Sequence, residues 1–135
     1  MSQVTTALLI AAGLFNLAFA VFHLFFWRLF RWPQQLAKLS AANRGIVQVL
    51  NLCLTYLFAF SALLCFLFPD ELASTELGRF ALLGLTGFWL VRAIYQPMFF
   101  GLEHPLSIAL FFIFVLGTLI HGGAWWTAGG ILRGG

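Results

Sequence analysis

Four long apolar segments constrain the fold of this 135-residue chain more than any other feature. They cover roughly residues 4–27, 44–68, 78–100 and 105–126. Each is longer than the ~20 residues that an α-helix needs to cross about 30 Å of hydrocarbon. Hydrophobic residues make up 62% of the chain and charged residues 8%, so too few polar side chains remain to cover a water-soluble domain. The sequence therefore predicts an all-α integral membrane protein, a four-helix transmembrane bundle that forms a single domain over residues 1–135.

The connections between the segments have the composition of loops and turns. Residues 28–41 are dense in basic and amide side chains. Residues 69–75 form a turn with carboxylates, and Ser74 or Thr75 is suited to cap the helix that follows. A tight connection over residues 101–105 joins the last two segments.

The few charged residues indicate how the chain is oriented in the membrane. The first loop and its rim hold four basic residues: Arg28, Arg31, Lys38 and Arg44. The opposite face holds two basic residues, Arg79 and Arg133, together with Asp70, Glu71 and Glu76. Cytoplasmic loops carry an excess of Lys and Arg, so we expect this first loop in the cytoplasm and both termini outside. The formal charge of +3 is scattered between apolar runs, which does not favour nucleic acid as a partner.

Polar residues recur at helical spacing inside the second segment. Arg44, Gln48, Asn51 and Thr55 are spaced by four, three and four residues, which places them on one helix face. An Arg near the centre of a membrane helix costs about 2.5–3.5 kcal/mol on insertion scales. We therefore expect this face to meet other helices or a water-filled cavity. The alternative is that Arg44 only anchors the helix end and that the amides only bond helix to helix.

The other segments carry polar faces of their own. These faces are Asn16 with His23 in the first segment, Trp89 with Arg92 and Gln96 in the third, and Ser107 with Phe114, Thr118, His121 and Trp125 in the fourth. The order of the segments puts seven polar residues in the cytoplasmic half of the bundle: His23, Arg44, Gln48, Arg92, Gln96, Glu103 and His104. Asn51 is expected about 10 Å deeper than Arg44, close to Asn16.

This half of the bundle is the predicted site for the polar head of an amphipathic ligand, such as a lipid, an isoprenoid or a quinone. The candidate binding residues are Arg44, Gln48, Asn51, Arg92, Gln96, His23 and Asn16. The expected partners are membrane lipids and a lipophilic small molecule. One alternative is a structural or accessory subunit of a membrane complex or a homo-oligomer, in which the polar residues only join helices.

A second alternative is a small membrane enzyme acting on a lipid, with His23 or Glu103 as the acid–base group. No metal site and no cofactor are expected, because the sequence lacks a Cys-x-x-Cys pair, clustered carboxylates and a Gly-rich phosphate loop. Haem held by His23 and His104 on different helices remains an alternative.

A short pattern near the first loop resembles a known kind of protein. It consists of His23 followed by Trp27, the stretch AANRG at 41–45, and Asn51. The pattern resembles a widespread group of uncharacterised small bacterial membrane proteins with four helices. In that group a His and a Trp close the first helix, and an Asn-(Gln/Arg)-Gly…Asn element opens the second. The resemblance covers roughly residues 20–60 and implies a four-helix protein of the bacterial inner membrane, with no activity to carry over.

Overall fold

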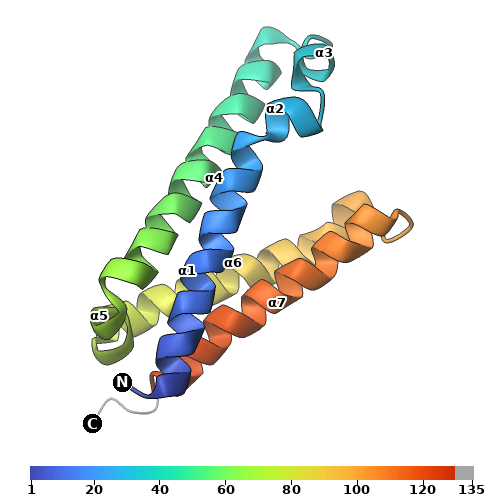
Figure 1. Ribbon diagram of the computed structural model, residues 1–135. Helices are drawn as coiled ribbons and strands as arrows, with labels where there is room; N and C mark the ends of the chain where they lie inside the picture. The colour runs from blue at the N-terminus through green and yellow to red at the C-terminus, as the bar shows by residue number, and fades with distance from the viewer. Residues whose placement is uncertain (130–135) are drawn as a thin grey trace. The chain divides into compact units, whose positions relative to one another are not determined.

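A computed structural model describes residues 1–129, and this part of the chain consists of α-helices joined by short turns (Figure 1). In chain order the helices are α1 (Gln3–Leu24), α2 (Phe26–Leu29), α3 (Trp32–Leu36), α4 (Ala41–Leu67), α5 (Pro69–Ser74), α6 (Glu76–Phe100) and α7 (Pro105–Thr127). The all-α prediction is confirmed. Arg133, which we expected on the face opposite the first loop, lies outside the described residues.

The helices α1, α4, α6 and α7 correspond to the four apolar segments. Within residues 1–129, these four are long and apolar enough to cross a membrane. Their ends differ from the predicted bounds by a few residues. The first ends at Leu24, and the second already begins at Ala41, which places Arg44 inside its first turn. The chain thus has the candidate spans of a multi-pass membrane protein.

Contacts within the chain group the residues into two compact units. One unit comprises residues 13–63, and the other comprises residues 1–12 with the chain from residue 64 onward. The boundaries fall inside α1 and α4. The single domain expected from the sequence stays a prediction.

In the 13–63 unit, the second part of α1 is joined to α4 through the short helices α2 and α3 (Figure 1). The rings of Phe19 and Phe58, one from each long helix, lie 5.8 Å apart and are both buried. Arg31 separates α2 from α3 in the left-handed conformation, with φ 51°. Pro33 then occupies the first turn of α3, where its missing N–H is not needed.

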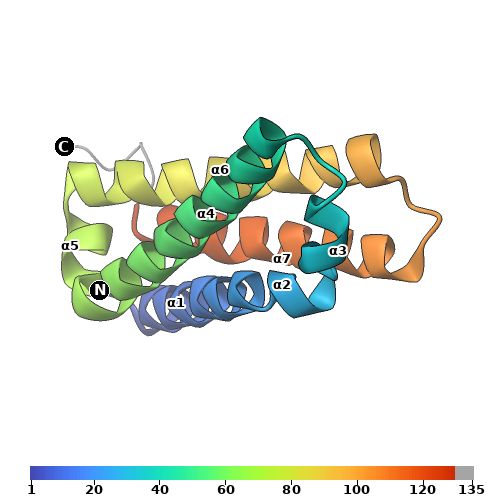
Figure 2. The ribbon, with the colours of Figure 1, turned by 90° about the horizontal axis from the view of Figure 1, so that it is seen from above.

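In the other unit, α6 and α7 lie side by side (Figures 1 and 2). A buried apolar cluster packs the pieces of this unit together: Leu9, Ala12, Cys65, Leu72, Ala73, Leu82 and Ala124. The turn between α6 and α7 begins at Gly101, whose φ of 65° favours glycine. It ends at His104, the N-cap of α7, and Pro105 follows in the first turn.

The junction of α5 with α6 depends on two residues. The hydroxyl of Thr75 accepts a hydrogen bond of 2.9 Å from the backbone N–H of Gly78, which confirms the predicted cap at Thr75. Gly78 itself lies against the backbone of α5. A Cβ added there would overlap the carbonyl oxygen of Glu71 and would lie 2.5 Å from the Cα of Leu72. The short helix can therefore fold back on α6 only because residue 78 has no side chain.

Candidate functional site

Four of the seven predicted binding residues, His23, Asn51, Arg92 and Gln96, belong to two groups of contacting residues, one in each unit. The first, which we call the His23 cluster, consists of His23, Asn51 and Thr55 with the rings around them. The second, which we call the Arg92 face, consists of residues of α6 and α7: Trp89, Arg92, Gln96, Phe100, Ser107, Phe114 and His121.

In the His23 cluster, two hydrogen bonds join α1 to α4. The amide Nδ2 of Asn51 donates to the backbone carbonyl of His23 at 3.1 Å, and this orients the Asn51 side chain. Its Oδ1 then lies 2.8 Å from Nδ1 of His23. An amide oxygen only accepts, so Nδ1 of His23 is the donor in this bond and carries a proton. The hydroxyl of Thr55 donates to the carbonyl of Asn51 on the same helix.

Aromatic rings surround His23. Its ring stacks on that of Phe26, with centroids 4.2 Å apart, and meets the edge of Phe58 at 5.2 Å. The hydrogen bonds between His23 and Asn51 thus lie among apolar side chains, an environment in which polar side chains bond from helix to helix. This geometry fits the interhelical role that the sequence left open for both residues.

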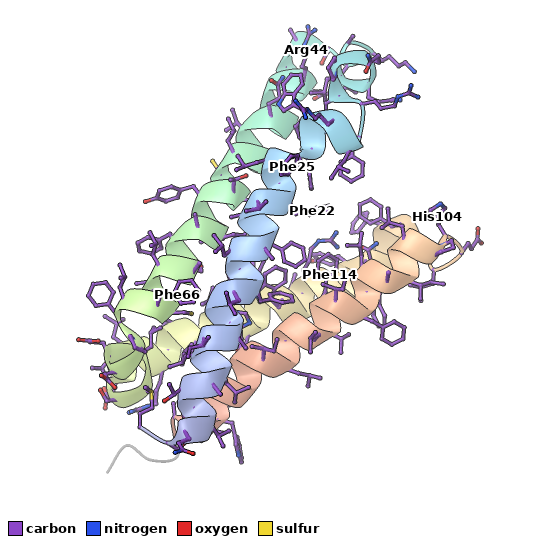
Figure 3. The ribbon with its side chains drawn as sticks, in the orientation of Figure 1. Phe22, Phe25, Arg44, Phe66, His104 and Phe114 are labelled. Atoms are coloured by element: carbon purple, nitrogen blue, oxygen red, sulfur yellow. The ribbon has the colours of Figure 1, made fainter. Side chains whose placement is uncertain are left out.

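The polar face predicted along α4 does not act as one unit. Arg44 is exposed at the start of the helix, as Figure 3 shows. Gln48 donates from Nε2 to the carbonyl of Arg44 on its own helix, at 3.1 Å. Asn51 is bonded to His23, while Asn16 is fully buried in α1. The three side chains at 44, 48 and 51 share a helix face, as predicted, yet each has a different environment.

In the Arg92 face, the polar faces predicted for the third and fourth segments meet each other. The ring of Trp89 stacks on Phe114 with centroids 6.0 Å apart and lies 6.2 Å from the ring of His121. Gln96 donates from Nε2 to the hydroxyl of Ser107 at 2.9 Å. Ser107 in turn donates to the carbonyl of Gly101, so one chain of hydrogen bonds fixes the turn between α6 and α7.

Arg92 is the cation embedded in this face. Its guanidinium carbon lies 4.2 Å from the ring centroid of Phe114 on α7, labelled in Figure 3, and 5.6 Å from that of Phe100 on α6. Among residues 1–129 the guanidinium has no carboxylate partner and no side-chain hydrogen bond. Phe100 lies eight residues further along α6, about 12 Å along its axis, so the side chain of Arg92 extends toward that end of the helix.

A second polar atom in this face is also unsatisfied. The Oε1 atom of Gln96 is buried and accepts no hydrogen bond from any described residue. Gln96 follows Arg92 by four residues, which places both side chains on the same side of α6. The face thus offers the several N–H donors of a guanidinium and one amide acceptor.

The remaining sequence candidates lie at the turn between α6 and α7. His104 accepts a hydrogen bond from the N–H of Leu106 through Nδ1, which makes it the cap of α7. It is exposed at the tip of this hairpin (Figure 3), and Glu103 next to it is exposed as well. His121, which lies further along α7 in the Arg92 face, is bonded through Nδ1 to the carbonyl of Gly117, at 2.7 Å.

Phe114 was expected on the polar face of the fourth segment, but neither Phe114 nor Phe100 was predicted to contact the cation. The spacing of eight residues between Arg92 and Phe100 was the available signal, because it places both on one side of a helix.

Metal ligands do not gather in the described part of the chain, where no three His, Cys, Asp or Glu side chains are close enough to hold an ion. Comparison with known protein families, with characterised proteins and with solved structures finds no match for this chain. The fold defines its class as an all-helical, multi-pass membrane protein.

Proposed function

We propose that this protein binds the polar head of an amphipathic molecule inside the membrane, at the Arg92 face. The ligand class is a lipid, an isoprenoid or a quinone whose head carries a phosphate, a carboxylate or a carbonyl. The observation that carries the proposal is the position of Arg92, a cation within a candidate membrane span that lacks a carboxylate partner among residues 1–129.

The energetics of Arg92 favour an external acceptor. Placing an arginine within a span costs about 2.5–3.5 kcal/mol on insertion scales. Contact with an aromatic ring returns only about 0.5–2 kcal/mol. It also leaves the N–H groups of the half-buried guanidinium without acceptors among residues 1–129. An oxygen-rich head placed beside Phe114 would fill those positions through charge-assisted bonds.

Gln96 requires a hydrogen-bond donor from the ligand, whereas Arg92 requires an acceptor. Its buried Oε1 needs a donor, and it lies one helical turn from Arg92 toward the end of α6. A head group that combines an acceptor oxygen with a hydroxyl satisfies both side chains. The bonds from Gln96 to Ser107 and from Ser107 to Gly101 hold the amide in place before a ligand arrives.

We place the protein in a bacterial inner membrane, with the 28–41 loop in the cytoplasm and both termini outside. The excess of basic residues in that loop supports this orientation. It puts the end of α6, and with it Arg92, in the half of the membrane nearer the cytoplasm.

The proposal is tested by ligand titration of delipidated protein in detergent. Decyl phosphate supplies an anionic head and decylubiquinone supplies a carbonyl head. Hydrogen bonds to a charged group contribute about 1.5–3 kcal/mol, so Arg92→Gln should weaken binding of the better probe by about 10–100-fold. Arg79→Gln, a matched change near the start of α6, should leave binding unchanged.

Equal binding by wild type and Arg92→Gln would contradict the proposal. If Arg92→Gln instead changes the oligomeric state and no probe binds, a structural or accessory subunit is the better description. If a bound lipid is converted in a way that depends on His23 or Glu103, the protein is a small membrane enzyme.

A further inference from the structure

The segment that joins α1 to α4 concentrates positive charge without any compensating negative charge. We call residues 25–44 the basic elbow; it contains α2, α3 and the first turn of α4. Its basic residues are Arg28, Arg31, Lys38 and Arg44, and all are exposed. The first acidic residue of the whole sequence is Asp70. Within residues 1–129, none of the four cations is paired with a carboxylate.

Aromatic residues alternate with these cations. Phe25, Trp27 and Phe30 are exposed, whereas Trp32 is buried and packs its ring against the edges of Phe26 and Trp27 at 5.7 and 6.0 Å. The elbow follows one candidate span and precedes the next, so it lies at the depth of a membrane interface. Exposed aromatic rings and long basic side chains are the residues that occupy this layer.

Arg31 adds an independent observation. Its backbone is left-handed, with φ 51° and ψ 44°, a conformation that glycine adopts readily and that strains an arginine. Its carbonyl accepts from the N–H groups of both Gln34 and Gln35, and a glycine carbonyl would do the same. No described residue bonds or pairs with its side chain. No hydrogen bond or ion pair within residues 1–129 therefore accounts for an arginine at this strained position, and this favours a use for its charge outside the described chain.

We propose that the basic elbow binds the phosphate groups of anionic phospholipids in the head-group layer of the leaflet that it faces. Four exposed cations are complementary to these phosphates, and the exposed rings fix the elbow at the same depth. This inference does not depend on a ligand at the Arg92 face, because the elbow lies in the 13–63 unit and uses different residues.

The test uses the full chain in nanodiscs with equal amounts of phosphatidylglycerol and phosphatidylcholine, followed by release and native mass spectrometry. Wild type should retain phosphatidylglycerol in clear excess over phosphatidylcholine. Each basic residue near an anionic surface favours binding on the order of five-fold. The triple variant Arg28→Gln/Arg31→Gln/Lys38→Gln should therefore lose nearly all of the excess. Arg79→Gln, which lies outside both proposed sites, should keep it.

The single variant Arg31→Gly keeps the test decisive if the triple variant fails to fold. It removes one charge and relieves the left-handed backbone, so the unfolding temperature in phosphatidylcholine should stay the same or rise. Its phosphatidylglycerol excess should fall on the order of five-fold. The proposal would be overturned if wild type retained the two lipids in the same ratio as in the nanodisc. An unchanged phosphatidylglycerol excess in Arg31→Gly would also overturn it. So would an excess that disappears in Arg92→Gln alone.

Discussion

Gly78→Val is expected to destabilise the protein by about 2–4 kcal/mol, because the new side chain would enter space that the backbone of α5 occupies. The overlap involves the carbonyl oxygen of Glu71 and the Cα of Leu72, and a backbone segment cannot move aside as a flexible side chain can. Leu72 and Ala73 belong to the buried cluster of their unit, so displacement of α5 also exposes apolar surface. Gly78→Ala should act in the same direction with a smaller effect.

Thermal unfolding followed by circular dichroism in a mild detergent measures this effect. Gly84→Ala is the matched control, since Gly84 lies on the same helix and a Cβ added there meets no atom within 4 Å. That change should be neutral or slightly stabilising, because alanine favours a helix more than glycine does. An unfolding temperature of Gly78→Ala equal to that of wild type would mean that α5 does not pack on α6 as described.

Asn51→Leu should destabilise the protein by about 1–3 kcal/mol through the loss of both hydrogen bonds between α1 and α4. Leucine has a similar volume, so the expected loss comes from the unsatisfied Nδ1–H and carbonyl of His23 rather than from a cavity. The same unfolding measurement applies. Cys53→Ala, an exposed position on α4, is the control and should change little.

A double-mutant cycle shows whether the destabilising effects of changing His23 and Asn51 are coupled or independent. If His23 and Asn51 are bonded to each other, His23→Ala combined with Asn51→Leu should cost clearly less than the sum of the single changes. Strict additivity of the two changes would contradict the bonding described for the His23 cluster.

The positions of the long helices were predictable because membrane thickness sets their length and apolar composition marks them. Helical spacing also predicted which side chains share a face. Trp89, Arg92 and Gln96 do meet Phe114, Ser107 and His121. Both results follow from geometry that every α-helix shares.

The partners of individual side chains were not predictable in the same way. Spacing placed Asn51 near the depth of Asn16, whereas the structure bonds its amide to His23. Gln48 shares a face with Asn51 but turns back to a carbonyl of its own helix, a local bond that competes with contacts between helices. Choices of this kind depend on rotamers and on the depth of each turn, which periodicity does not encode.

The short helices were missed for a related reason. The bend between α2 and α3 depends on a left-handed arginine, and sequence rules assign that conformation to glycine or asparagine. The helix α5 depends on its close approach to Gly78, whose contact partner cannot be inferred from a single glycine in an apolar segment.

Native mass spectrometry of the protein extracted gently from its own membrane tests ligand binding at the Arg92 face most directly. We expect a discrete adduct on wild type and on Arg79→Gln, and its loss on Arg92→Gln with the protein still folded. A wild-type protein that carries no adduct, as a monomer or as an oligomer, would contradict a tightly bound ligand and would favour a structural subunit.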